Sequence, residues 1–323
     1  MRYLNPKADL TFKKVFGEHP DLIISFLNAL LPFEKPEEEI TQVEYLNPEM
    51  VPQTPFHKDS IVDVRCKDQS GRQFIVEMQM IWSPEYKQRV LFNASKAYVR
   101  QIKTGEDYKL LQPVYSLNLV NDMLEPDLKG YYHYYRLVHA EHTDRVIDGL
   151  HLIFVELPKF TPHTYSEKRM QVLWLRYLTE IDERTRLVPA ELMANPEVKK
   201  AVTELEESAF TDAQLLGYEK FWDSISVEKT LYNSAERRGM AAGMAKGLAQ
   251  GMAEGLAQGM AKGLEQGIAK GLAQGMVEGL EQGKKEGGKQ QSLFIARKMK
   301  TKGMPEVDIA EMTGLTIEEI RTL

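Results

Sequence analysis

The chain has 323 residues, of which 43% are hydrophobic and 27% are charged, and its formal net charge is −6. This composition fits one sizeable globular domain with an extension, and the negative charge argues against a protein that coats DNA through bulk positive charge. The single cysteine, Cys66, excludes a disulfide framework, so we expect a reducing, cytoplasmic location. Because no long uncharged apolar run occurs, we expect no membrane span.

Hydrophobic periodicity predicts helices and strands in alternation along the first half of the chain. Two helices are expected first, followed by a strand and a hairpin, and Ser83-Pro84 then favours the start of a helix that ends near residue 102. The expected segments are helices at 8–17 and 21–31, a strand at 39–46, hairpin strands at 61–67 and 72–80, strands at 113–120, 131–138 and 150–157, and helical structure over 161–236. This order predicts an α/β fold with a mixed sheet.

The predicted hairpin has one apolar face and one polar face. The apolar side chains at alternate positions are Val62, Val64, Cys66, Phe74, Val76, Met78 and Met80. The loop Gln69-Ser70-Gly71 fits a type I turn closed by a glycine in the left-handed region. This loop pairs residue i with residue 140 − i, which places Asp63 opposite Glu77.

The acidic pair is the feature of the hairpin that points to chemistry. Two carboxylates on opposite strands repel each other and weaken a sheet, whereas a divalent cation between them would create a binding site. Gln79 points to the same face because it lies two residues from Glu77. The alternative interpretation is an ordinary amphipathic hairpin in which one acidic pair occurs by accident.

The hairpin resembles the core motif of the PD-(D/E)xK nucleases, in which one acid and a following E-x-K hold a catalytic metal. The wider segment, about residues 1–240, resembles the Rpn/transposase-associated branch of that superfamily. The matching pieces are ADLTFKKVF at 8–16, IVDV at 61–64, IVEMQ at 75–79, Arg89, Tyr98, GEDYKLL at 105–111 and PVYSLNLV at 113–120. Gln79 stands where the superfamily usually has lysine, and this branch commonly carries glutamine there.

This resemblance implies a restriction-endonuclease-like core with flanking helices and a DNA endonuclease activity linked to recombination or transposition. It implies that Asp63, Glu77 and Gln79 are catalytic. It also implies that Asp63, Glu77 and the backbone carbonyl of Met78 bind Mg²⁺, for which Mn²⁺ can substitute.

The resemblance further implies three accessory residues. Asp9 matches an early acid of the family, and its alternative role is an ordinary cap at the start of a helix. Lys13 and Arg89 would contact DNA phosphates, and their alternative role is a solvated or ion-paired helix face.

Two functions remain open at this point. The first is the metal-dependent endonuclease, and the second is a binding or regulatory protein that keeps the nuclease fold with weak or no catalysis. Gln79 and the acidic net charge favour the second function, whereas the intact pair of Asp63 and Glu77 favours the first.

Glycine recurs at every fourth position from Gly239 to Gly287, in a repeating G-Φ-A-x unit where Φ is mostly Met, Leu or Ile. Each glycine costs about 1 kcal/mol relative to alanine in a helix. We therefore expect a helical or flexible tail that is ordered by packing against a second copy, giving a homo-oligomer, or against the chain's own body. Charged residues such as Lys246 and Glu254 argue against a membrane location.

We expect four segments along the chain. They are a nuclease-like core at 1–160, a helical extension at 161–236, the glycine-repeat tail at 237–289 and a small helix-turn-helix-like unit at 290–323. In the last segment, Glu318 and Glu319 stand where a DNA-reading helix would present basic or amide side chains, so we expect a packing or dimerising unit.

Overall fold

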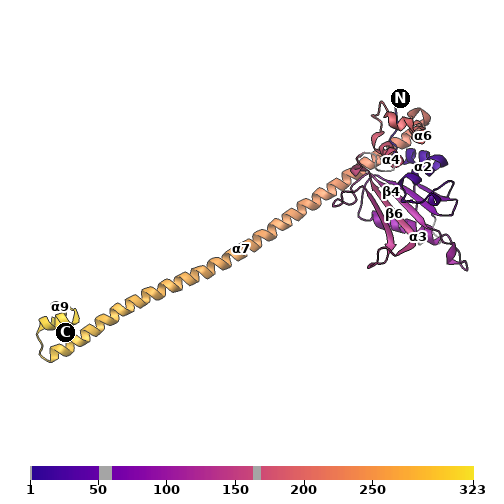
Figure 1. Cartoon of the computed structure of the whole chain (residues 1–323). Coiled ribbons are helices and arrows are strands. Elements are labelled where there is room, and N and C mark those ends of the chain that lie inside the picture. Colours follow the sequence, from indigo (N-terminus) through magenta and orange to yellow (C-terminus); the bar gives the residue numbers. More distant parts are fainter. Residues whose placement is uncertain (1, 51–59, 163–168) are drawn as a thin grey trace. The chain divides into compact units, whose positions relative to one another are not determined.

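The computed structural model describes residues 2–50, 60–162 and 169–323 (Figure 1). Its contacts define two compact units, Met1–Asn233 and Ser234–Leu323. Within the described ranges, six strands form one sheet in the order β1-β2-β3-β4-β6-β5. The strands are β1 (Val43–Tyr45), β2 (Val64–Asp68), β3 (Gln73–Gln79), β4 (Val114–Val120), β5 (Tyr132–Val138) and β6 (Val146–Glu156).

The first unit also contains helices and short 3-10 turns. They are α1 (Asp9–Glu18), α2 (Pro20–Leu30), α3 (Tyr86–Val99), α4 (Arg169–Glu180), α5 (Ala190–Ala194), α6 (Pro196–Thr203) and the start of α7 (Asp212–Thr301), with short 3-10 turns η1 (Pro36–Glu38), η2 (Tyr108–Leu110), η3 (Leu157–Lys159) and η4 (Glu207–Ala209). Strands β3, β4 and β6 are parallel, whereas β1, β2 and β5 pair antiparallel with their neighbours. The sheet is therefore mixed, as the sequence predicts.

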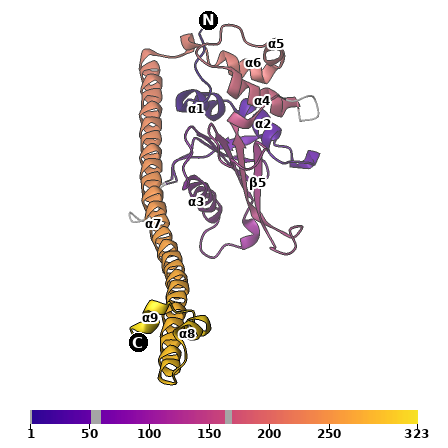
Figure 2. The same ribbon diagram turned by 90° about the vertical axis from the view of Figure 1, so that its left-hand side faces the viewer.

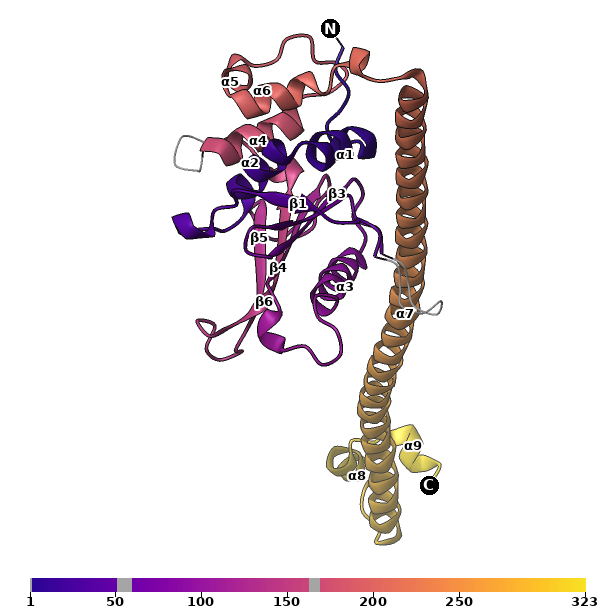
Figure 3. The ribbon, with the colours of Figure 1, turned by 90° about the vertical axis from the view of Figure 1, so that its right-hand side faces the viewer.

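Both faces of the sheet are covered. Helices α1 and α2 contact β2 and β1, and α3 contacts β4 and β6 (Figure 3). An aromatic cluster holds the first layer together, with the ring centroids of Phe16 and Phe26 4.3 Å apart and those of Phe26 and Trp174 5.5 Å apart. All three side chains are fully buried, so helix α4 belongs to the same core as α1 and α2.

The hairpin forms with the predicted register. Val64 pairs with Val76, and Cys66 pairs with Phe74. Gly71 has a φ of 84°, in the left-handed region that the predicted turn requires. The carboxylate of Asp68 also accepts hydrogen bonds from the backbone N–H groups of Ser70 and Arg72, both at 2.9 Å, and so fixes the loop.

The faces of the hairpin differ from the prediction in two respects. Strand β2 begins at Val64, and the chain bends at Asp63, so Val62 packs beside Ile75 rather than beside Val64. The expected polar outer face is covered by α3, which places Ala94 and Ala97 in the same cluster as Ile75. Alternation within two strands does not specify a distant helix that packs on them.

Other element boundaries also shift. Helix α3 begins at Tyr86, three residues after the serine expected to start it. Strand β1 is shorter than expected and covers Val43–Tyr45, whereas β6 is longer and begins at Val146. The longer β6 arises from its antiparallel pairing with β5, which continues past a register shift after Arg136.

In the second unit, α7 continues through the whole glycine repeat, and α8 (Glu306–Thr313) and α9 (Ile317–Arg321) pack on its last turns (Figure 2). The small core contains Ala296, Ile309, Leu315 and Ile320. Gly314 ends α8 with a φ of 69°, and the side chain of Thr316 caps α9 by accepting from the N–H of Glu319.

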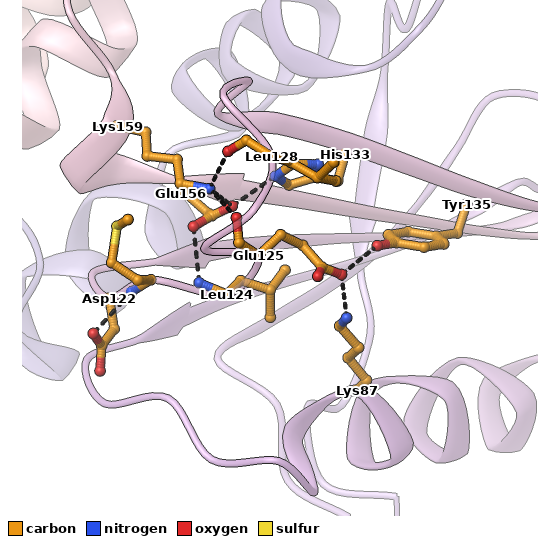
Figure 4. A network of polar contacts seen from close by, with 10 residues as sticks. Lys87, Asp122, Leu124, Glu125, Leu128, His133, Tyr135, Glu156 and Lys159 are labelled. Carbon is orange, nitrogen blue, oxygen red and sulfur yellow. Dashed lines mark hydrogen bonds and ion pairs between the residues drawn. The ribbon is translucent and has the colours of Figure 1, made fainter.

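A buried carboxylate fixes the loop after β4. Glu156 is fully buried at the end of β6, and it accepts hydrogen bonds from the N–H of Leu124 and from Lys159 Nζ, both at 2.8 Å (Figure 4). His133 Nε2 lies 2.6 Å from the same carboxylate. Both oxygens of this buried group therefore have partners.

The neighbouring contacts extend this network to α3. Lys159 Nζ also donates to the backbone carbonyl of Leu128 at 2.7 Å, and the carboxylate of Glu125 accepts from Lys87 and from the hydroxyl of Tyr135 (Figure 4). The loop is thus held at the carboxyl edge of the parallel strands.

We predict that Glu156→Gln lowers the free energy of unfolding by about 3–5 kcal/mol, because the buried Lys159 loses its charged partner. Urea unfolding of the full chain, followed by tryptophan fluorescence, measures this change. The matched control is Glu44→Gln, which removes an exposed ion pair with Lys67 and should change stability by about 0–1 kcal/mol. Equal effects of the two substitutions would contradict the role of the buried network.

Candidate active site

The residues that the sequence singles out lie near the carboxyl end of β3. Glu77 and Gln79 belong to the end of this strand, and Asp63 directly precedes its antiparallel neighbour β2. In sheets with parallel strands, ligands bind outside the carboxyl ends of the strands. The topology therefore places these side chains where a site is expected.

Asp63 is held by the backbone of the opposite strand. Its carboxylate Oδ2 accepts a hydrogen bond from the N–H of Met78 at 2.7 Å. Burial raises the pKa of Asp63 to about 6, and the negative charges of Glu77 and Asp9 raise this pKa as well. The carboxylates of Asp63 and Glu77 are thus close enough to repel each other.

Glu77 is only 5% exposed and lies between two side chains of α3. Its Oε1 accepts from the amide of Asn93 at 2.9 Å, and its Oε2 lies 3.6 Å from the guanidinium of Arg89. Burial raises the pKa of Glu77, although the contacts with Asn93 and Arg89 oppose this shift. The amide of Asn93 is itself oriented by the hydroxyl of Ser60, at 2.5 Å.

Arg89 joins Gln79 to the acidic pair. The Oε1 atom of Gln79 accepts from the guanidinium at 2.5 Å, and its Nε2 atom donates to the backbone carbonyl of Ile81 at 2.6 Å. The guanidinium also lies over the ring of Tyr86, 4.8 Å from its centroid. A positive charge from α3 therefore stands beside the position at which the superfamily usually has lysine.

Asp9 and Lys13, on α1, have charges that affect the pKa of Asp63. They form an ion pair at 2.6 Å, and the charge of Lys13 lowers the pKa of Asp63 while that of Asp9 raises it. The alternative role of Asp9 as a helix cap is wrong, because Ala8 occupies the N-cap position. Lys13 has the expected ion-paired surface position and remains a candidate for a phosphate contact.

The donor atoms of the site suit a hard divalent cation. Among the residues that the structure describes, no group of three or more His, Cys, Asp or Glu side chains is arranged to hold a metal. Two carboxylates are sufficient for Mg²⁺, which keeps several waters and binds proteins through one or two carboxylates together with substrate phosphates. The raised pKa values of Asp63 and Glu77 show that this pair lacks full compensation from the protein.

Two residues of this site, Asn93 and Ser60, were not predicted from the sequence. Asn93 lies four residues after Arg89, which places the two side chains on the same face of α3. That spacing was a usable signal, because both residues contact Glu77. Ser60 gave no such signal, since its role depends on the bend that follows it.

The first half of the chain and the segment that follows it match one known family. Residues 6–229 match the family described as PD-(D/E)XK nuclease family transposase. The chain therefore belongs to this family, and a nuclease role follows for its first unit. No curated protein and no solved structure matched the chain.

In the described part of the chain, no helix has both the length and the apolar character needed to cross a membrane.

We predict that Asp63→Asn stabilises the protein at pH 7.5 in the absence of divalent cations. The folded pKa of about 6 exceeds the ordinary 3.8, so the folded state binds more protons in this interval and its stability falls as the pH rises through it. The amide oxygen can still accept from Met78, and the gain should be about 1–2 kcal/mol at pH 7.5 and vanish near pH 4.

Urea unfolding in EDTA at both pH values measures this effect. Asp144→Asn, in an exposed loop, provides the control and should show no such pH-dependent gain. An equal effect of Asp63→Asn at the two pH values would contradict the electrostatic cost assigned to Asp63.

Proposed function

We propose that this chain is a metal-dependent DNA endonuclease that hydrolyses phosphodiester bonds in the cytoplasm, in connection with recombination or transposition. The observation that carries the proposal is the pair of Asp63 and Glu77 at the carboxyl end of β3, with Arg89 in contact with both Glu77 and Gln79. The family supports a nuclease role. The metal, the DNA substrate and the biological process are parts of the proposal.

Asp63, Glu77 and the backbone carbonyl of Met78 would hold the cation, with Mg²⁺ as the physiological ion and Mn²⁺ as a substitute. A divalent ion in such a site lowers the pKa of a bound water and stabilises charge on the leaving oxygen. The protein's contribution is to fix the two carboxylates: the N–H of Met78 holds Asp63, and the amide of Asn93 holds Glu77.

Gln79 and Arg89 divide the tasks that one lysine performs elsewhere in the superfamily. A neutral amide orients water by hydrogen bonds but supplies no charge, whereas a guanidinium is always charged and matches the geometry of a phosphate. The contact between Arg89 and Gln79 at 2.5 Å brings both functions to one place. We propose that Arg89 binds the substrate phosphate and that Gln79 positions the attacking water, with Asp9 and Lys13 as accessory charges.

One observation favours the alternative function, a binding or regulatory protein with weak catalysis. Both ends of the Gln79 amide are already engaged, by Arg89 and by the backbone of Ile81. To orient a water molecule, Gln79 must release one of these partners. The cleavage assay described next separates the two functions.

We predict that the purified full chain cleaves plasmid DNA with Mg²⁺ or Mn²⁺ and not in EDTA. Asp63→Ala and Glu77→Ala should lose at least about 100-fold in rate, and Glu77→Gln should do the same because charge rather than shape binds the ion. Circular dichroism checks that each variant is folded. Cleavage at the wild-type rate by both alanine variants would reject this site.

The same assay tests the cationic residue. Arg89→Ala should lower the rate about 10- to 100-fold, whereas Gln79→Lys should keep or raise it, because the new lysine restores charge at the strand position. Arg100→Ala, at the other end of the same helix, is the control for a general loss of positive charge. A similar loss in Arg89→Ala and Arg100→Ala would indicate bulk electrostatics instead of a role in the site.

We also propose that the chain forms a homo-oligomer through the glycine-repeat tail. The Met, Leu and Ile side chains of the repeat are exposed on α7, with Met252 at 68% and Leu264 at 67%, and thirteen glycines cost on the order of 13 kcal/mol in an isolated helix. The glycines would allow the helix of a second copy to approach closely, and that helix would bury these side chains.

We predict that removal of residues 239–323 leaves a folded first unit that self-associates less than the full chain. Its core lies within residues 1–233, so the truncation should not unfold it. Sedimentation velocity of the two proteins at equal concentration measures the change. Identical oligomeric states would reject the tail as the association element.

A further inference from the structure

A hollow of about 410 Å³ adjoins the candidate active site. It lies between residues 60–61, which precede β2, and the first turns of α3. Its lining includes Ser60, Ile61, Tyr86, Arg89, Phe92 and Asn93. The volume falls within the range of small-ligand pockets, about 300–1,000 Å³.

The hollow shares three side chains with the acidic site, those of Ser60, Arg89 and Asn93. Asn93 donates to Glu77 and accepts from Ser60, while Arg89 contacts Glu77 and Gln79. A phosphate placed against Arg89 would therefore lie at the boundary between the acids and the hollow. The nucleoside attached to that phosphate is the part of a DNA substrate nearest to the hollow.

The walls of the hollow suit a flat, partly apolar group. Phe92 is 44% exposed and Ile61 is 66% exposed, and both face the hollow beside polar groups from Ser60 and Arg89. Aromatic side chains stack on nucleobases, and such stacking tolerates any base because each base has a π face. A phosphate or a metal ion alone would gain nothing from these two side chains.

We propose that this hollow receives an unpaired nucleobase next to the cleaved phosphate. The proposal rests on the endonuclease function above and names its substrate class: DNA with an unpaired or extruded base. A base inside an intact duplex is covered on both faces by its neighbours, so it cannot stack on Phe92 unless it leaves the helix. The negative net charge of the chain also supports this proposal. A weak overall attraction for the DNA phosphates means that contacts with bases must supply a larger share of the binding affinity.

The test compares two labelled DNA substrates of the same sequence, one a full duplex and one with a short internal bubble. The full-length wild-type chain with Mg²⁺ should cleave the bubble about tenfold faster than the duplex. Phe92→Ala should remove most of this preference, and Phe92→Tyr should retain it. Leu91→Ala is the matched control, because Leu91 is an exposed residue of the same helix, 46% accessible, outside the lining of the hollow.

Thermal melting shows whether Phe92→Ala is folded, and Ile61→Ser tests the opposite wall if it is not. Equal cleavage of duplex and bubble by the wild type would overturn the proposal. So would a preference that survives both Phe92→Ala and Ile61→Ser.

A binding measurement separates this proposal from the endonuclease function. A 2-aminopurine placed in the bubble should change its fluorescence when the full chain binds in Ca²⁺, and Phe92→Ala should reduce that change while Leu91→Ala should not. If the wild type cleaves no DNA with any divalent cation, the endonuclease function fails. The fluorescence measurement still tests whether the hollow binds a base. An equal change in both variants overturns the hollow as a base site.

Discussion

The electrostatic cost of two neighbouring carboxylates governs this site. The backbone N–H of Met78 fixes Asp63, and Glu77 is the residue directly before Met78 in β3. The backbone of this strand therefore holds the two acids close together. Neither carboxylate can turn to solvent without losing this position or its burial. The charges of Arg89 and Lys13 offset the cost of burying these two acids only in part, because burial still raises the pKa values of both. A site that keeps this cost is suited to a cation.

The contrast with Glu156 shows that the cost is specific to the site. Glu156 is also buried at the carboxyl end of a parallel strand, yet Lys159 and a backbone N–H compensate it directly. The sequence places a lysine three residues after Glu156, whereas Glu77 is followed two residues later by a glutamine. The fold can therefore neutralise a buried acid at this edge of the sheet, and it does not do so fully at Asp63 and Glu77.

The parts of the structure that local chemistry determines could be predicted from the sequence. The register of β2 and β3 follows from a three-residue loop closed by Gly71, and the cap of α9 follows from Thr316. The face of the sheet on which Val62 packs could not be predicted, because the bend at Asp63 interrupts the strand alternation that the prediction assumed. The burial of Glu77 likewise depends on α3, whose packing is a tertiary contact. Asn93 could have been inferred from its four-residue spacing to Arg89, whereas nothing in the sequence pointed to Ser60.

In the proposed nuclease, Arg89 would have two alternative anionic partners, Glu77 and a substrate phosphate. Its distance to Glu77 is 3.6 Å, longer than a hydrogen bond, and the side chain is half exposed. Without a cation, release of Arg89 would leave the buried carboxylate of Glu77 with less compensation, which has a cost. A cation held by Asp63 and Glu77 would reduce that cost, because it would weaken the attraction of Glu77 for the guanidinium. In the proposed nuclease, occupation of the acidic pair and release of Arg89 toward the phosphate are thus linked by charge, whereas a lysine in the place of Gln79 would stay fixed to the strand.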